Sequence, residues 1–494
     1  MPSNFSSALP FEPSSITSAL TDQFAHPDNL LPGSIAAQFL QWLRNPGLSQ
    51  EHRPIRLRIQ RGQQPFGDAL VAHSFQIDEE VCADTSVRIR VLCVCTRADL
   101  PPTSLRGMPM SLQIVTDRGT LRTINAIITR AQPGQSDGGA QVWMIEAEDA
   151  LSIKRKSSNS RVFLRHSVID IANRLLSEWQ QTDPVLAESF DFDLSQLNAQ
   201  DYPVREMTIQ WNESDADLLI RLFRKHGLAW GIRAGAGEGT PCHTLVLWDA
   251  SGSLPQNEAG TVRYHHDGAT QQRDGITLWS PVASLVPSRV ERRTHDYVSQ
   301  SMAEQEVSTM ADMGASGNDL AKGLVDAVVE PPHWGDSQED FRRLATLRMQ
   351  RYEMEADYID GASGLRDAAC MTWVEVQGLP GAEAALSAED RQFTFVQVTH
   401  HGQNNLPKDL NERIIGMFAA SGWAPTRPVI SADDESRRYA NTFRAVPHKV
   451  AIVPAFELAT HWPTMGAINA QIVCPPGEVV HCDESARVKL RFFG

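Results

Sequence analysis

The sequence contains no long apolar run, and this absence limits where the protein can act. No stretch reaches the roughly 18 consecutive apolar residues that a membrane-spanning helix needs. The first residues, MPSNFSSALPFEPSS, also lack the basic and apolar regions of a cleavable secretory signal. We therefore expect no stable membrane insertion in this region, and any export to proceed without a cleaved signal.

Paired cysteines are missing as well. The 7 cysteines are an odd number, scattered along the chain without a CxxC pair, so the sequence predicts neither a disulfide framework nor a zinc site. Cys93 and Cys95 alternate on one expected strand, where their side chains share a face. We interpret the cysteines as free thiols, which is typical of folding in a reducing compartment.

Basic charge is in the minority. The chain carries 45 Lys and Arg residues against 60 Asp and Glu, which gives a formal net charge of −15. A surface that binds nucleic acid needs clustered cations, so we expect no nucleic-acid partner. The apolar content of 41% is enough for sizeable cores, and the length of 494 residues favours about three domains.

Sequence motifs of catalysis are also absent. The chain has no GxSxG turn, no HExxH zinc motif and no GxGxxG or GxxxxGK[ST] loop. Glu353, Glu355 and Asp360 could supply carboxylates, but no acid/base partner is identifiable, and a charged helix face is the simpler interpretation. We therefore predict no catalytic residues, no cofactor-binding residues and no enzyme within residues 1–494.

Two histidine pairs and one acidic run are the remaining candidates for metal ligands. His265 and His266, like His400 and His401, are adjacent, and adjacent side chains on a strand point to opposite faces. We interpret these histidines as surface or strand-end residues, and 433–435 (DDE) as a solvated charge run. The sequence therefore predicts no metal site and no cofactor.

The most clearly patterned stretch is Thr208–Ile232, which predicts a strand, a capped helix and a second strand. Ser214 offers an N-cap hydroxyl with Asp217 as its capping-box-like partner, and Gly227 supplies a left-handed stop. The helix carries an apolar stripe at helical spacing, which consists of Leu218, Leu219, Leu222 and Phe223. We expect this stripe to pack against a sheet.

The charges of the same helix follow its dipole. Acids fill the first turn and bases the last, and Asp217 and Arg221 form a well-oriented i,i+4 pair. We expect the charged side chains to point outward. The polar start at Glu213, Ser214 and Asp215 is interpreted as helix capping in preference to a binding site.

Strand patterns dominate the first part of the chain. After an N-terminal extension (1–51) with a short helix at 34–43, six closely spaced strands predict a small antiparallel β-barrel over 52–150. Residues 151–250 predict a small α+β domain, in which a second helix (167–179) is capped by Ser167 with Asp170 at its third position.

The later part of the chain is less regular. Residues 251–423 predict a second β-barrel from segments 261–265, 275–280, 288–298, 371–377 and 392–401. A helical insertion is expected at 336–358, and 309–328 is either helix or loop. Residues 424–460 read as a connector, and 461–494 open a further domain. Because the chain stops directly after the strand-like RVKLRFF, we expect a fragment of a longer protein.

Several segments, in the same order, resemble VgrG, the spike protein family of type VI secretion systems. The most specific are YPVREMTIQWNESDADLLIRLFRKHGLAW (202–230) and SSNSRVFLRHSVIDIANRLL (157–176). The others are SFQIDEEVCADTSVRIRV (74–91), VTHHGQNN (398–405) and GEVVHCDESARVKLRFF (477–493). The residues that we take as the structural signature are Glu213, Ser214, Asp215, Asp217, Leu219, Arg221, Leu222, Gly227 and Arg487.

The resemblance implies a mainly β fold with α+β insertions. It consists of two small antiparallel β-barrels, a small α+β domain and a truncated OB-fold that starts at residues 461–494. It also implies a homotrimer in which each chain presents two related barrels to a sixfold, Hcp-like tube protein. Baseplate proteins and a needle that carries a tip protein, effector or adaptor would be the other partners.

The implied location is the bacterial cytoplasm before firing, followed by secretion or injection into a target cell. Two alternatives remain open. One is the baseplate hub of a prophage or tailocin. The other is a spike with an effector enzyme in a C-terminal region beyond residue 494.

Overall fold

The computed structural model of the chain describes residues 50, 53–62, 64–65, 69–95, 97, 100–138, 140–235, 239–249, 254–265, 274–297, 299–379, 387–424, 438–462, 469–483 and 487–492. The helix expected at 34–43, the acidic run 433–435 and His266 lie outside these residues.

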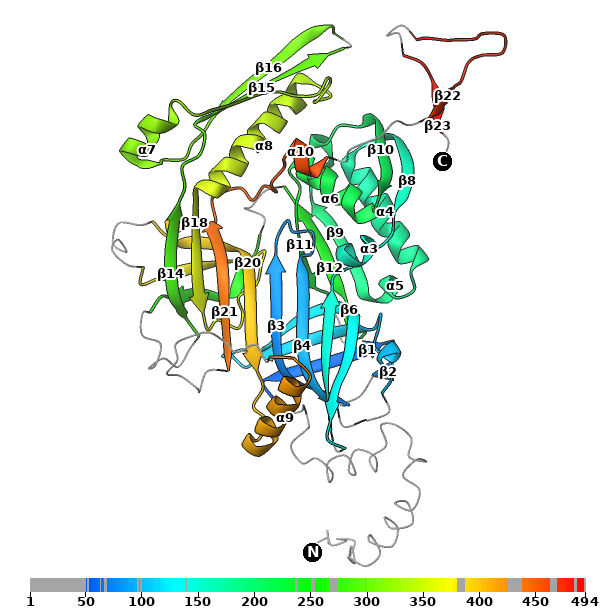
Figure 1. The fold of residues 1–494 in the computed structure, drawn as a ribbon. Coiled ribbons are helices and arrows are strands. Elements are labelled where there is room, and N and C mark those ends of the chain that lie inside the picture. The colour runs from blue at the N-terminus through cyan, green and yellow to red at the C-terminus, as the bar shows by residue number, and fades with distance from the viewer. Residues whose placement is uncertain are drawn as a thin grey trace, which may run out of the picture.

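A sheet of 13 strands forms the centre of the molecule (Figure 1). Its first half runs in the order β2-β1-β5-β6-β7-β4-β3. The strands are β1 (Ile55–Arg61), β2 (Gln64–Pro65), β3 (Leu70–Glu80), β4 (Val87–Cys95), β5 (Pro109–Val115), β6 (Leu121–Ser136) and β7 (Gln141–Glu148). Successive side chains of a strand point to opposite faces of the sheet. Along β4, Val87 and Ile89 are buried on one face, while Arg88 and Arg90 are exposed on the other.

The second half of the sheet comes from strands far apart in the sequence. It continues in the order β20-β21-β18-β14, with β19 paired to both β20 and β13. The strands are β13 (Gln256–Arg263), β14 (Ile276–Ala283), β18 (Asp357–Ser363), β19 (Trp373–Gln377), β20 (Gln392–Gln403) and β21 (Tyr439–Pro447). The predominance of strands confirms the predicted fold class at the level of a mainly β protein with α+β insertions.

The two halves meet where β3 and β20 pair antiparallel, from Ser74 opposite Gln403 to Glu80 opposite Gln397. The path of paired strands from β14 to β2 is open within the described residues, so the two separate closed barrels that we predicted are not observed. The reason is physical: β3 and β20 are long strands with 11 and 12 residues, and each uses its free edge to pair with the other half.

Between the two halves, the chain builds an α+β region. It comprises α3 (Ala150–Lys154), β8 (Asn159–His166), α4 (Val168–Thr182), α5 (Leu186–Ser189), β9 (Phe190–Gln196), β10 (Arg205–Glu213), α6 (Asp215–His226), β11 (Ala229–Ala234) and β12 (His243–Trp248). Among the strands that the structure describes, β8 pairs only with β10, and β12 lies between β11 and β9. Ser167 and Asp170 form the predicted reciprocal capping box of α4.

A projecting arm occupies much of the second part of the chain (Figure 1). It consists of β15 (Arg289–Asp296), β16 (Ser301–Ser308), α7 (Gly314–Ala321), β17 (Val325–Val329) and α8 (Gln338–Ala356). Segment 288–298 therefore belongs to a separate three-stranded sheet, β16-β15-β17, and not to the second barrel as predicted. Segment 309–328 contains both a helix and a parallel strand, because β15 has a second edge that β17 occupies.

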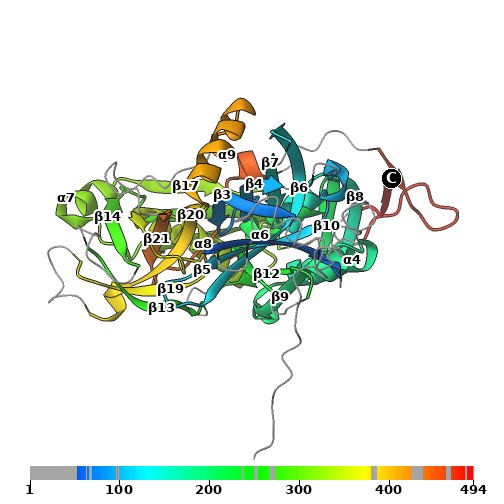
Figure 2. The same cartoon turned by 90° about the horizontal axis from the view of Figure 1, so that it is seen from below.

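The expected connector 424–460 also differs from the structure. Tyr439–Pro447 forms β21, which lies between β18 and β20 in the main sheet. Its nine residues were hidden in a polar, proline-rich stretch. Before it lies α9 (Lys408–Ala420), which stands out from the sheet (Figure 2). After it come α10 (Leu458–His461) and the hairpin β22 (Ala470–Ile472) and β23 (Leu490–Phe492), so the OB-fold stays a prediction.

Two large apolar cores hold the molecule. One joins the first half of the sheet to the α+β region, and the other lies under the second half. Short 3-10 turns complete the described elements, at Pro102–Ser104, Ala199–Asp201 and Glu389–Arg391. None of the helices in the described ranges is long and apolar enough to cross a membrane.

The β3–β20 contact gives a first prediction, because Gly402 packs directly against the ring of Phe75. A Cβ at this position would overlap the ring, so we expect Gly402→Ala to lower the free energy of unfolding by about 1–3 kcal/mol. Gly416→Ala, in open space on α9, is the control and should raise it by about 0.5–1 kcal/mol. Denaturant titration measures both, and equal effects would contradict this packing.

Candidate functional site

Helix α6 begins and ends at the residues that its sequence predicts. The hydroxyl of Ser214 accepts a hydrogen bond from the Asp217 amide at 2.9 Å. Gly227 has a φ of 71°, in the left-handed region that favours glycine. A Cβ at Gly227 would also overlap the side chain of Leu347 on α8. The apolar stripe, including Leu219 and Leu222, is buried, so α6 is a packing anchor in the α+β region.

The expected pair between Asp217 and Arg221 is not formed. Arg221 instead reaches back to Glu213, with Nη2 at 2.5 Å from Oε1 and Nε at 3.1 Å from Oε2. Asp217 is paired with Arg155 at 2.7 Å. The helical spacing was right, but Arg221 lies on a buried face that also places its Nη2 3.1 Å from the Ile209 carbonyl. Arg221 therefore pairs with the carboxylate of Glu213, whose side chain is 11% exposed, and not with that of Asp217, which is 40% exposed.

Asp215 is the polar centre of the helix start. Its carboxylate accepts hydrogen bonds from Arg161 at 2.9 Å, from the Gln210 amide at 2.8 Å and from the Trp179 indole at 3.2 Å. These partners come from β8, β10 and α4 respectively. A carboxylate at this end of α6 is also favoured by the helix dipole. The start of α6 thus ties together four elements of the α+β region.

The basic end of α6 is buried, against the prediction that its charges point outward. Lys225 is 5% exposed and His226 is 2% exposed. The Lys225 ammonium lies 4.1 Å from the centre of the Trp334 ring, and Arg343 of α8 donates to the His226 carbonyl at 2.9 Å. Burial lowers the pKa of both Lys225 and His226 well below their ordinary values. The local pattern could not reveal that the arm covers this second face of α6.

Residues 448–462, which we term the strap, cross the joint between α6 and α8. Three arginines from these helices bind consecutive carbonyls of the strap: Arg351 to Pro454 at 2.7 Å, Arg224 to Ala455 at 3.0 Å and Arg348 to Phe456 at 3.1 Å. Trp462 of the strap lies over the Arg221 guanidinium at 5.1 Å. The strap is therefore fastened through its backbone.

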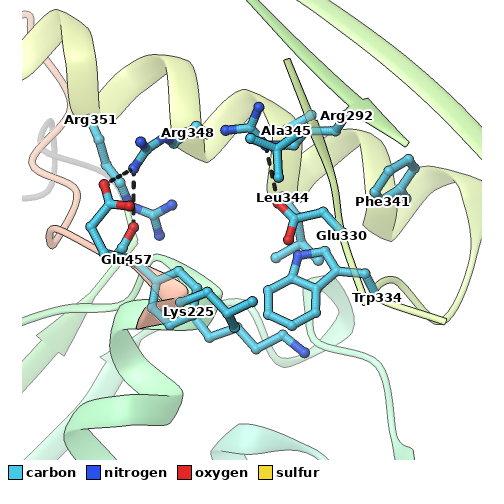
Figure 3. Close-up of a pocket in the computed structure, with 13 residues that line it drawn as sticks. Lys225, Arg292, Glu330, Trp334, Phe341, Leu344, Ala345, Arg348, Arg351 and Glu457 are labelled. Carbon is cyan, nitrogen blue, oxygen red and sulfur yellow. Dashed lines mark hydrogen bonds and ion pairs between the residues drawn. The ribbon is translucent and has the colours of Figure 1, made fainter. Parts of the chain in front are cut away.

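A small cavity of about 110 Å³ lies at this joint (Figure 3). Its wall includes two ion pairs, Arg292 with Glu330 at 3.1 Å and Arg348 with Glu457 at 2.5 Å. The aliphatic part of Lys225 and the Trp334 indole close the opposite side. A space of this size and polarity suits a few ordered waters, and the charged groups around it are occupied in holding the arm to the body.

A second polar cluster lies at the contact between the two halves of the sheet. Glu79 of β3 pairs with Arg122 of β6, and its Oε1 is 3.3 Å from Nε2 of His400 on β20. Nδ1 of His400 is 2.6 Å from the Tyr439 hydroxyl of β21. Burial would raise the pKa of Glu79, but Arg122 and His400 outweigh it and hold that pKa at about 2. Glu79 is therefore an ionised carboxylate inside the protein.

His400 corrects our interpretation of the histidine pairs. It is fully buried and burial lowers its pKa, whereas we predicted a surface or strand-end residue. The signal was present: His400 lies two residues from the buried Val398 on the same face of β20. No such signal pointed to Glu79 or Arg122, because their contact joins residues 43 positions apart.

A larger space of about 490 Å³ opens where β6, β13 and the loop around Asp367 meet the α+β region. Arg118 pairs with Asp367 at 3.0 Å and with Glu258 at 3.2 Å beside it. Among the residues with described positions, no cluster of three or more His, Cys, Asp or Glu could hold a metal ion. The cysteines are all free thiols, and burial raises the pKa of Cys82 to about 12.

Arg487 is the one signature residue outside the α+β region. It lies in the C-terminal hairpin, where Nε is 2.7 Å from Asp483, and it reaches Glu206 at the start of β10 at 2.7 and 2.9 Å. The structure thus brings the residues from Glu213 to Gly227 together around α6 and places Arg487 at the other end of β10.

Comparisons with known proteins agree on one family. The model of the phage tail baseplate hub (GPD) family matches residues 79–406. The type VI secretion system spike protein VgrG5 of Pseudomonas aeruginosa is 26% identical over 405 residues, covering 81% of this chain and 46% of the relative. The actin cross-linking toxin VgrG1 of Vibrio cholerae is 34% identical over 363 residues, covering 71% of this chain and 28% of that protein.

A solved structure shows the same fold. The E. coli c3393 protein, described as a component of the type VI secretion system with structural similarity to the T4 bacteriophage tail proteins gp27 and gp5, matches with a TM-score of 0.57. It is 15% identical, and the match covers 89% of both chains. The chain spans about half the length of VgrG5, the curated relative with which it shares 405 aligned residues.

The fold and these matches define a hub protein of the phage tail baseplate class. The chain belongs to the phage tail baseplate hub family, whose model covers more than half of it. Its resemblance to the VgrG spike proteins of type VI secretion systems, predicted from the segment around Glu213, is confirmed.

The buried pair of Arg221 and Glu213 gives a second prediction. Arg221→Ala should lower the free energy of unfolding by about 3 kcal/mol, because the carboxylate of Glu213, which is only 11% exposed, is left without its partner. Arg293→Ala is the matched control, since it removes a pair with Glu304 whose side chains are 54% and 63% exposed, and should cost less than about 1 kcal/mol. Urea titration measures both. If Arg293→Ala destabilised the protein as much as Arg221→Ala, the larger contribution that we assign to the Arg221–Glu213 pair would be wrong.

Glu79 gives a third prediction, which concerns pH. Its folded-state pKa of about 2 lies below the ordinary 4.5, so ionised Glu79 contributes stability above pH 4.5 that is lost as the pH falls toward 2. The stability difference between the wild-type protein and Glu79→Gln should therefore narrow over that range in denaturant titrations. Glu258→Gln, at a side chain that is 77% exposed, is the control and should change the free energy of unfolding by less than about 1 kcal/mol. A constant gap for Glu79→Gln would refute the assignment.

Proposed function

We propose that this chain is the structural hub and spike component of a type VI secretion contractile injection apparatus. The observation that carries the proposal is the continuous sheet: two halves of the chain form one rigid wall through β3 and β20, in a protein of the baseplate hub family. The charged groups described above pair with one another and fasten elements together. A supporting role therefore accounts for them, and we propose no enzyme within the described residues.

We further propose that the protein acts as a homotrimer on the end of a hexameric, Hcp-like tube. A threefold object fits a sixfold ring if each chain offers two related surfaces. The two halves of the main sheet are the candidates for these surfaces, in place of the two closed barrels that we had expected. Baseplate proteins would surround this assembly, and an OB-fold and needle above it would carry a tip protein, effector or adaptor.

The proposed location follows from this role. The trimer would assemble in the bacterial cytoplasm and leave the cell when the apparatus fires, into the medium or a target cell. A second candidate is favoured by the name of one relative, an actin cross-linking toxin: a spike that also carries an effector enzyme. The baseplate hub of a prophage or tailocin is a third possibility.

Deletion of the gene gives the fourth prediction. We expect the strain to retain tube protein inside the cells but to lose its release into the medium, because the tube has no hub to assemble on. The intact gene should restore release, and light scattering of the full protein should give the mass of three copies. The readout is an immunoblot of cells and culture medium.

The alternatives separate in the same strain. Unchanged release of tube protein would overturn the secretion role, and a loss of phage tails or tailocins after induction would assign the chain to a prophage or tailocin baseplate.

A further inference from the structure

The cavity of about 490 Å³ is bounded by both halves of the main sheet and by the α+β region. Its walls come from β3 and β6, from β9, β11 and β12, and from β13 and the segment 367–372. Leu121, Arg233 and Glu258 line it with side chains that are 44%, 53% and 77% exposed, so the cavity is open to solvent. A concave space of this size is typical of ligand sites.

Part of the wall is apolar. Ile232, Val246, Leu254 and Met371 line the cavity and are 8%, 3%, 5% and 6% exposed. The sulfur of Met371 packs against Gly231, where a Cβ would lie 2.5 Å from it. Met371 also has a φ of 64°, which a bulky residue rarely adopts, and such conformations gather at binding sites. An apolar group that enters the cavity would be buried here.

Arg122 contributes a hydrogen-bond donor to the polar part of the wall. Its side chain is 10% exposed, and its Nη2 is bonded to Glu79. Its Nη1 is buried and has no hydrogen-bond partner among the described residues. Leaving a buried donor without an acceptor costs free energy. A ligand that offers an acceptor to Nη1 would recover that cost.

The charges around the cavity are already balanced. Glu79 pairs with Arg122, and Asp367, whose side chain is 6% exposed, pairs with Arg118 at 3.0 Å. An entering carboxylate would lie near Glu79 and Asp367, and an entering ammonium would lie near the two guanidinium groups. Either charge would lose its water without gaining a partner of its own. The cavity therefore suits an uncharged ligand that combines an apolar group with a hydrogen-bond acceptor.

Strand β13 bulges where it borders the cavity. It pairs with β19 at Gln256 and again at Thr261, so Asn257–Gly260 lie outside the ladder. Asn257 and Glu258 of this bulge line the cavity. Bulges are frequent beside active sites, and main-chain groups outside a ladder can bind the main chain of an extended peptide.

We propose that this cavity binds an extended, uncharged segment of a partner protein. One apolar side chain of the segment packs against Val246 and Met371. The main-chain carbonyl beside it accepts a hydrogen bond from Nη1 of Arg122, and the flanking main chain pairs with the bulge of β13. This site goes beyond the proposed hub function, and the isolated protein would bind the segment whether or not tube release depends on this chain.

Methyl NMR of the full chain tests the site, because Met371 reports from its wall. The probe is the peptide acetyl-Ala-Leu-Ala-amide, added to protein labelled at the methionine methyl groups, with signals assigned through Met→Leu variants. We expect the Met371 signal to shift and saturate, while that of Met310, which is 92% exposed on the arm, stays in place. Acetyl-Ala-Asp-Ala-amide should shift neither signal. An unmoved Met371 signal, or equal shifts with the aspartate peptide, would overturn the proposal.

The length of the probe separates an extended segment from a lone apolar group. Acetyl-leucine-amide lacks the flanking main-chain groups, so we expect it to bind about tenfold more weakly than acetyl-Ala-Leu-Ala-amide. Equal affinities would refute the recognition of an extended segment.

Two substitutions test the residues of the wall. Thr123→Trp fills the cavity from β6 and should weaken binding of the leucine tripeptide about tenfold or more. Thr129→Trp, at another half-buried threonine of β6 that does not line the cavity, is the matched control and should leave the affinity unchanged. Arg122→Lys keeps a cation beside Glu79 but removes Nη1, and should also weaken binding about tenfold.

Thermal unfolding of each variant confirms that it is folded before its affinity is compared. Wild-type affinity in folded Thr123→Trp or in folded Arg122→Lys would overturn the site. Failure of the gene deletion to block tube release would refute the hub function alone, since the peptide titration does not depend on it.

Discussion

The pairing of β3 with β20 is the contact on which the rest of the architecture depends. These strands are separated by more than 300 residues, yet their seven paired positions turn two sheets into one. Closing such a loop costs entropy that only a long ladder and a well-packed flank can offset. The buried Glu79–Arg122 pair and His400 lie beside the ladder as a cluster of charged and polar side chains. Burying a charge there costs free energy unless its partner is present. The cluster therefore favours the one alignment of the two halves that brings these partners together.

In the α+β region, too, charged side chains at a contact hold two parts of the molecule in a fixed arrangement. α6 packs its apolar stripe on one side in the usual way, and its charged side is then covered by α8 and the strap. Lys225 keeps its ammonium over the Trp334 ring, and Arg221 keeps Glu213. The arm is thereby held to the body through polar and aromatic contacts. Such contacts form only in a specific geometry. They therefore hold the arm to the body in one orientation.

Local sequence patterns were sufficient to predict many of the helices and strands. They were insufficient to predict which residues these elements contact. The caps at Ser214 and Ser167, the stop at Gly227 and the strand alternation of β4 are short-range features, and the sequence predicted them correctly. The choice of Glu213 by Arg221, the burial of His400 and the insertion of β21 between β18 and β20 depend on surfaces contributed from distant residues. Periodicity describes one face of one element, so it cannot show what covers the opposite face. The function is proposed from the family resemblance, because composition and periodicity do not identify a partner.

The arginine contacts of the strap have a mechanical consequence. Arg351, Arg224 and Arg348 bind three successive carbonyls, and they belong to two different helices. A pull along the strap from its C-terminal side would load these hydrogen bonds together, in shear, instead of peeling them one after another. Bonds loaded in parallel share the force. The force that breaks them together is therefore larger than the force that breaks the same number of bonds one after another. The three hydrogen bonds thus make the strap more resistant to such a pull than bonds that break in sequence would.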